Sequence, residues 1–220
     1  QMLFYLPLSG STFKKVYYDD LLGRAVSKFV PADDLIVPYS ANSLEDAEGI
    51  IHVIKISENE LRKQQVSGFY RDIELGTPPI TENQLEDKKL ELEGISKDAQ
   101  EDQYTLYEIH TNLDLEGYED VGEDGEPTGI KLPYVITVAQ ANSKVLSIRR
   151  NYNANDPRKN KINYFVQFKF LPGTGFYGFG LIHMIGGLTR TATAALRQLL
   201  DAGTLANLPA GFKSRGIRVR

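Results

Sequence analysis

The hydrophobic pattern near the C-terminal end constrains the fold of this chain most strongly. From Gly178 onward, apolar residues recur every three or four positions, at Leu181, Ile185, Leu188, Ala192, Ala195 and Leu199. This spacing places them on one side of an α-helix. We expect the helix to end near Gly203, because glycine readily adopts the left-handed conformation of a C-cap. It is the longest element that the sequence predicts.

Much of the surface of this helix is small or weakly polar. Glycine, alanine and threonine make up most of residues 186–195, and Arg190 and Arg197 are its only charges before Asp201. Helices with such surfaces can approach each other closely, so this one suits packing against copies of itself in a bundle or ring. The alternative is an ordinary helix that covers one sheet. The residues that we expect at a subunit contact are Gly186, Thr189, Arg190, Thr193 and Arg197.

The first half of the chain predicts short strands and polar helices. Residues 13–18 and 25–30 are typical of a β-hairpin around an Asp/Gly turn. Residues 35–37 lie between two prolines, which permit only a short edge strand. The β-branched run 50–56 predicts a further strand. Capping pairs that predict short helices are Ser43 with Asp46, Ser57 with Glu60, and Thr81 with Gln84.

The second half predicts four further strands, at residues 104–115, 132–138, 145–152 and 162–171. An acidic loop and a short Asn/Asp/Pro turn separate them, so we expect a four-stranded meander. The fold class is therefore α+β, with antiparallel sheets and short helices followed by a long C-terminal helix.

Composition removes several classes of function. The chain has no cysteine, so neither a disulfide framework nor a thiolate metal site can form. Every apolar run is interrupted before the roughly 18 residues that a membrane helix needs, so we expect no membrane segment. An apolar run directly after Gln1 and an alternating, partnerless pattern at residues 216–220 indicate that the sequence is part of a longer polypeptide.

Charge is distributed in blocks along the chain. Residues 71–126 hold 18 Asp and Glu against 4 Lys and Arg, whereas residues 144–169 hold 7 Lys and Arg against one Asp. The blocks could be two solvated faces of one domain, or the basic part could meet a polyanion or a neighbouring subunit.

Residues 173–178 read Gly-Thr-Gly-Phe-Tyr-Gly, which is a G-x-G-x-x-G pattern between a predicted strand and a predicted helix. A dinucleotide site also needs a following parallel strand that ends in an Asp or Glu for the ribose. The only acid downstream is Asp201, inside the helix. We therefore interpret the glycines as a flexible strand-to-helix corner.

No other pattern predicts catalysis, a cofactor or a metal ion. His52, His110 and His183 have no ligand spacing and are expected to be structural. The loop around Asp120 resembles a calcium loop, but Gly122 and Lys131 stand where ligands are needed. No serine lies in a nucleophile elbow. We expect no enzymatic activity.

Several segments resemble the portal proteins of podovirus-type tailed phages and related prophages. They include FKKVYYD at 13–19, LGR at 22–24, FVPADDL at 29–35 and the run from 178 to 213, which ends LLDAGTLANLPAGFK. They cover both ends and the middle of the chain in the family's order.

The resemblance implies a domain plan. Residues 1–171 would form a wing-like α+β domain that includes the acidic segment 71–126, residues 172–202 a stem-like helix, and residues 203–220 the start of a clip-like region. The residues expected at the clip entry are Asn207, Lys213 and Arg215.

The resemblance also implies an assembly at one vertex of the virion capsid, built in the host cytoplasm. Twelve subunits would form a ring, and their partners would be the terminase large subunit, a tail adaptor, and capsid and scaffolding proteins. Double-stranded DNA would pass through the ring without sequence-specific contacts. No cofactor is implied.

Two other functions stay open at this point. One is a nucleotide-binding enzyme that uses the glycine pattern at 173–178, for which isothermal titration with NAD and ATP, and loss of binding in Gly175→Val, would be the test. The other is a self-assembling structural protein that does not come from a phage.

Overall fold

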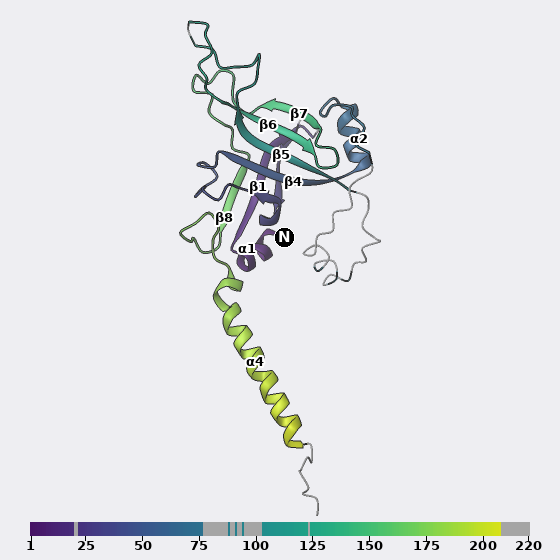
Figure 1. The fold of residues 1–220 in the computed structure, drawn as a ribbon, viewed down its shortest axis with the longest axis vertical. Coiled ribbons are helices and arrows are strands. Elements are labelled where there is room, and N and C mark those ends of the chain that lie inside the picture. Colours follow the sequence, from purple (N-terminus) through teal and green to yellow (C-terminus); the bar gives the residue numbers. More distant parts are fainter. Residues whose placement is uncertain are drawn as a thin grey trace, which may run out of the picture.

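Two stacked antiparallel sheets form a body from which one long helix projects (Figure 1). This computed structural model describes residues 1–19, 22–76, 88, 91, 94, 103–122 and 124–207. The predicted helix that opens at Thr81 with Gln84 lies outside the described residues, as do Lys213 and Arg215.

The first sheet has three strands in the order β2-β1-β8, formed by β1 (Ser11–Asp19), β2 (Arg24–Val30) and β8 (Phe165–Lys169). The hairpin of β1 and β2 is confirmed, with Phe13 opposite Val30 and Tyr18 opposite Ala25. Side chains alternate between the two faces of a strand. Phe13 is therefore buried while Val16 is exposed.

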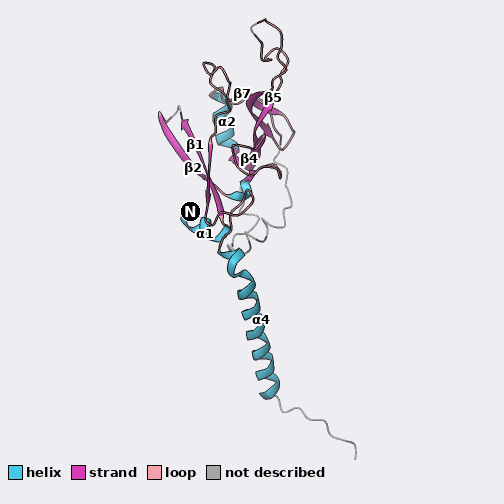
Figure 2. Cartoon of the chain, turned by 90° about the vertical axis from the view of Figure 1, so that its left-hand side faces the viewer, coloured by secondary structure: helices cyan, strands magenta, loops and turns pink. Residues whose placement is uncertain are grey.

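The second sheet has five antiparallel strands in the order β3-β4-β5-β6-β7. The strands are β3 (Leu35–Ile36), β4 (Gly49–Ser57), β5 (Gln103–Leu113), β6 (Leu132–Ala139) and β7 (Val145–Arg150). The short edge strand between the two prolines is confirmed as β3. Figure 2 shows the two sheets as separate layers.

The four-stranded meander is wrong in its last strand. Instead of adding to β7, β8 crosses to the other sheet and pairs with β1, so that Phe165 lies opposite Lys15. Phe165 there joins Phe13 and Ile50 in the core between the layers. Alternation along a strand predicts which of its faces is buried, but it does not identify the neighbouring strand.

The short helices are α1 (Met2–Ser9), a 3₁₀ turn η1 (Ala32–Asp34) and α2 (Glu58–Val66). The cap of α2 is confirmed, because Ser57 Oγ accepts a hydrogen bond from the backbone N–H of Glu60. Ser43 Oγ accepts one from Asp46, yet only turns follow. The predicted helix there is wrong because Leu44 and Ala47 turn into the core instead.

The long helix α4 (Leu181–Asn207) passes the predicted C-cap by four residues. Gly203 lies inside the helix and does not have a positive φ. Thr204 Oγ1 donates to the carbonyl of Leu200, within the same helix. A glycine inside a helix costs only about 1 kcal/mol, so the helix tolerates it.

Two apolar clusters share the inner face of the five-stranded sheet. One lies under the three-stranded sheet and includes Phe13, Ile50 and Phe165. The other lies under α2 and includes Leu61 and Leu106. A group of charged and polar side chains separates them, as described below.

Candidate functional site

The helix α4 has no buried side chain over its 27 residues. At about 1.5 Å per residue it is roughly 40 Å long. Its apolar side chains are exposed, including Leu188 at 72% and Leu199 at 69%. A helix this apolar is normally covered by another element. Among the described helices and strands, α1 provides its main contact.

The five residues expected at a subunit contact lie together on one side of α4. They line a shallow groove that begins at Leu8 of α1 and includes Ile182 and Ile185. The residues of the prediction in this groove are Gly186, Thr189, Arg190, Thr193 and Arg197. A Cβ added to Gly186 would have no atom within 4 Å, so the surface of the helix is uncovered at this position.

The hydroxyl groups of the groove threonines donate their hydrogen bonds within the helix. Thr189 Oγ1 donates to the carbonyl of Ile185 at 3.0 Å, and Thr193 Oγ1 donates to that of Thr189 at 2.9 Å. The hydroxyls therefore need no outside partner, and the surface is small and weakly polar. Asn207 is the last residue of α4.

The glycine corner before α4 is a tight backbone crossing. A Cβ on Gly178 would lie 2.7 Å from the carbonyl oxygen of Gly10, and one on Gly180 would lie 2.2 Å from that of Leu8. Gly10 itself has a φ of 84°, which favours glycine. Three glycines thus let the end of α1 cross the start of α4. The corner is anchored at Gly178, whereas a Cβ on Gly175 would have no atom within 4 Å.

Hydrogen bonds hold this crossing together. The N–H of Gly178 donates to Ser11 Oγ at 2.7 Å, and the N–H of Phe179 donates to the carbonyl of Leu171 at 2.8 Å. The N–H of Gly180 donates to Nδ1 of His183 at 3.1 Å, so His183 caps the first turn of α4. A pyrophosphate would have to displace these partners, and β8 is an antiparallel edge strand. The arrangement differs from a dinucleotide site.

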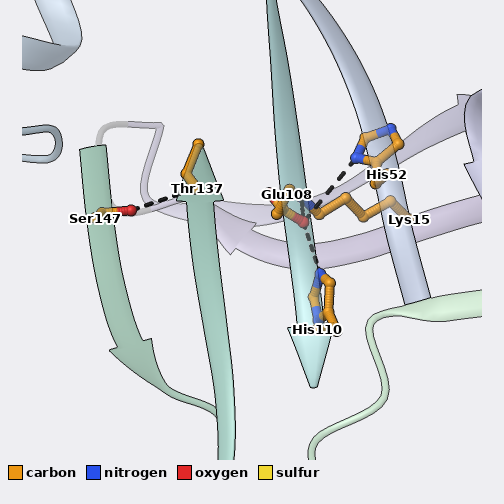
Figure 3. A network of polar contacts seen from close by, with 6 residues as sticks. All are labelled: Lys15, His52, Glu108, His110, Thr137 and Ser147. Atoms are coloured by element: carbon orange, nitrogen blue, oxygen red, sulfur yellow. Dashed lines mark hydrogen bonds and ion pairs between the residues drawn. The ribbon is translucent and has the colours of Figure 1, made fainter. Parts of the chain in front are cut away.

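The other two histidines belong to a polar network between the sheets (Figure 3). Glu108 on β5 is at its centre, and Lys15 Nζ on β1 lies 2.6 Å from both of its carboxylate oxygens. His110 Nε2 lies 2.8 Å from Glu108 Oε1. His52, opposite Glu108 on β4, approaches the same oxygen at 4.0 Å. Both imidazole rings pack edge-on against Phe165.

Burial and charge decide the protonation states in this network. Burial lowers the pKa of His52 to about 4, and Lys15 acts in the same direction. Burial alone would raise the pKa of Glu108, but hydrogen bonds from His110 and Lys15 outweigh it and hold that pKa at about 2. At neutral pH the centre of the body is therefore an ion pair beside a neutral His52.

The acidic loop between β5 and β6 is held by a contact within the loop and by a contact with Lys159, which follows β7. Thr128 Oγ1 donates to Asp120 Oδ2 at 2.7 Å, and Lys159 contacts the other carboxylate oxygen of Asp120. Among the described residues, no group of three or more His, Asp or Glu has the geometry of a metal site. Nor is any described helix both long and apolar enough to span a membrane.

Comparison with known families places the chain. The sequence model of the family described as Phage SU10 portal protein matches residues 15–215. No curated protein matches the sequence of this chain. The match includes α4, the glycine pattern at 173–178 and every strand of both sheets except the first four residues of β1. Because it spans most of the 220 residues, this chain belongs to the phage SU10 portal protein family.

Proposed function

We propose that the chain forms part of the wall of a portal ring, the channel at one capsid vertex through which DNA is packaged and ejected. The observation that carries this proposal is α4, a helix of 27 residues with no buried side chain that extends away from a folded body. An isolated helix of this kind gains stability only when partners cover its apolar side.

The two sides of α4 suit a ring. At 100° per residue, Leu188, Ala195 and Leu199 form an apolar stripe, while Gly186, Arg190 and Arg197 lie on a different side. A closed ring uses heterologous contacts, in which one surface of a subunit meets a different surface of its neighbour. The small groove of one helix could accept the apolar stripe of the next.

The glycine crossing supports the proposal from the other end of the helix. Because Gly10, Gly178 and Gly180 bring two backbones into contact, the direction of α4 relative to the sheets is defined in each subunit. A ring needs this constancy, since an error in direction would repeat at every subunit. Residues 1–171 would then be the wing, residues 172–202 the stem, and residues 203–220 the start of the clip.

The partners follow from the portal role. The ring would dock the terminase large subunit during packaging, contact capsid and scaffolding proteins during assembly, and hold the tail adaptor afterwards. Hydrolysis of ATP would belong to the terminase. DNA would slide without sequence readout, so Arg190 and Arg197 would face neighbouring subunits rather than phosphates.

Negative-stain electron microscopy of the natural gene product tests the proposal. We expect rings with a central hole, of twelve subunits by the resemblance. Monomers that persist at high protein concentration would contradict it.

A further inference from the structure

The outer edge of β2 carries backbone groups that pair with no described element. β2 is the first strand in the order β2-β1-β8, and it lies at the outer side of the body beside β1 (Figure 2). Its pairing with β1 runs without a register shift from Arg24 to Val30, and the strand contains no proline. Exposed edge strands are commonly protected by a bulge or a proline. This edge has neither.

Hydrogen bonds on the other side of β1 show which residues of β2 face outward. The N–H of Val16 donates to the carbonyl of Tyr164 at 2.7 Å, on the side of β1 where β8 lies. In an antiparallel sheet, alternate residues of a central strand bond to opposite neighbours. Lys15 therefore bonds to Lys28, which stands opposite it on β2. The residues whose N–H and C=O lie on the free edge are Ala25, Ser27 and Phe29.

None of these three residues exchanges a backbone hydrogen bond with another described part of the chain. Ala25 and Ser27 are exposed, and Phe29 is partly exposed. An unpaired row of N–H and C=O groups is a template for a further strand. The edge can therefore accept an extended peptide.

Two cations flank the centre of this edge. Arg24 and Lys28 stand on the same face of β2 with Val26 between them, because side chains alternate along a strand. Both cations are exposed, and neither forms an ion pair with a described carboxylate. Lys28 Nζ instead lies 5.6 Å from the centre of the Tyr17 ring. A strand added to β2 would face both cations in the closely spaced type of pair, where side chains are nearest.

These charges disfavour a second copy of β2 as the occupant. If two β2 edges paired antiparallel about Val26, Arg24 of one copy would lie opposite Lys28 of the other. If they paired about Ser27, the two Lys28 side chains would be diagonal neighbours. Like charges at such positions are unfavourable, whereas opposite charges stabilise the pairing. The edge therefore suits an acidic strand.

We infer that β2 is a docking edge for an extended acidic segment of another protein, which adds to the three-stranded sheet as a fourth strand. Backbone hydrogen bonds to the free edge supply the affinity, and carboxylates opposite Arg24 and Lys28 supply the specificity. The segment carries acidic, apolar and acidic residues at alternate positions. The inference does not depend on the proposed ring, because every group belongs to one subunit.

A synthetic peptide with this pattern is the probe. Acetyl-Val-Glu-Thr-Val-Thr-Glu-amide, paired antiparallel with β2, places its two glutamates opposite Lys28 and Arg24. Its first valine lies opposite Phe29, whose ring already contacts Tyr5 of α1 at a centroid distance of 5.5 Å. Titration into the isotope-labelled chain, followed by amide NMR spectra, should give a Kd below about 1 mM.

Amide exchange with solvent reports how the peptide binds. The N–H groups of Ala25, Ser27 and Phe29 should exchange more slowly once the peptide is bound, because they gain hydrogen bonds. Exchange at Val26 and Lys28 should change little, because these residues already bond to β1.

Two control peptides separate the backbone contribution from the charges. A peptide with lysine in place of both glutamates should bind at least about tenfold more weakly, because two attractive pairs become repulsive. A glutamate peptide that is N-methylated at both threonines should not bind, because it cannot donate to the carbonyls of Ala25 and Ser27.

Substitutions in β2 test the same contact from the protein side. Ser27→Pro removes an outward N–H but no bond to β1, so it should abolish binding. Ser27→Thr is the matched control, which keeps the N–H and should bind normally. The double variant Arg24→Glu, Lys28→Glu should prefer the lysine peptide, and this gain also demonstrates that the variant is folded. Circular dichroism checks the fold of Ser27→Pro, and the N-methylated peptide decides the backbone role if that variant unfolds.

Four results would overturn the inference: no binding of the glutamate peptide at about 1 mM, equal binding of the glutamate and lysine peptides, binding of the N-methylated peptide, or normal binding by a folded Ser27→Pro variant. Edge amides that become protected as the concentration of the chain alone increases would identify a second copy as the occupant and would also overturn it. Ring formation by the natural gene product is a separate measurement, so this inference can fail while the portal proposal stands.

Discussion

Lys15 Nζ on β1 lies 2.6 Å from both carboxylate oxygens of Glu108 on β5, so one ion pair joins the two sheets of the body. Both side chains are largely buried, with 15% and 13% of their surfaces exposed. A charge that loses its partner in such a place is costly, whereas removal of both charges can be nearly neutral. The pair therefore couples the two layers and is sensitive to single substitutions.

Substitution Lys15→Met should destabilise the body by about 3 kcal/mol, because it leaves the Glu108 carboxylate buried without its cation. The measurement is the free energy of unfolding from urea titrations at pH 7.5. The double variant Lys15→Met, Glu108→Gln should recover much of this loss. A single variant that costs less than about 1 kcal/mol would contradict the role assigned to the pair.

Stability should fall as the pH decreases from 6.5 toward 4, because of His52. The pKa of His52 in the folded state is about 4, below the value of 6.5 for an exposed imidazole. The unfolded state therefore binds a proton in this range that the folded state does not bind. From pH 7.5 to pH 5 this costs about 2 kcal/mol by the linkage relation.

The control for this effect is His52→Leu, which cannot take up the proton. The loss of stability between pH 7.5 and pH 5 should be smaller in the variant by about the same 2 kcal/mol. Equal losses in the two proteins would exclude His52 as the source. Below pH 4.5 a further decrease should come from protonation of Glu108, whose folded-state pKa is about 2.

The crossing under α4 should not tolerate a methyl group at Gly178. A Cβ there would lie 2.7 Å from the carbonyl oxygen of Gly10 and 2.8 Å from that of Leu171. We expect Gly178→Ala to cost about 1–3 kcal/mol, as for other overpacked sites. Gly175→Ala is the control, because no atom lies within 4 Å of its Cβ position. Thermal unfolding of both variants compares them, and equal midpoints would argue against a constrained crossing.

Substitution Leu188→Glu on the apolar stripe of α4 should prevent assembly without unfolding the subunit. Leu188 is 72% exposed, so its loss should change the stability of the monomer by less than about 0.5 kcal/mol. Gln198→Glu adds a charge on another side of the helix and should still assemble. Native mass spectrometry reports the assembly, and circular dichroism the fold. Normal assembly of Leu188→Glu would remove the apolar stripe from the proposed interface.

The chain should bind double-stranded DNA weakly and without sequence preference. Its acidic segment repels phosphate, and binding by arginine and lysine alone decreases steeply with salt. Fluorescence anisotropy at about 200 mM salt should detect no tight complex. Sequence-specific binding under these conditions would contradict the picture of a channel through which DNA slides.

Much of the fold could be predicted from local pattern. The alternation in β1 and β4 and the cap at Ser57 are properties of neighbouring residues, and the structure agrees with them. The helical spacing from Leu181 to Leu199 also predicted the element on which the portal proposal rests. The sequence indicated the buried ion pair only weakly. Glu108 points to the same side of β5 as Leu106 and His110, which are buried.

Other features depend on contacts between residues far apart in the sequence, which local periodicity does not encode. The transfer of β8 to β1 is decided by the fit of Phe165 between the two layers. Gly178 is required because Gly10, 168 positions earlier in the numbering, supplies the opposing backbone. The sequence by itself determined the type of most elements and the exposed apolar stripe of α4. Only the tertiary structure decided the partner of each strand and the anchoring of the helix, because both result from packing between distant segments.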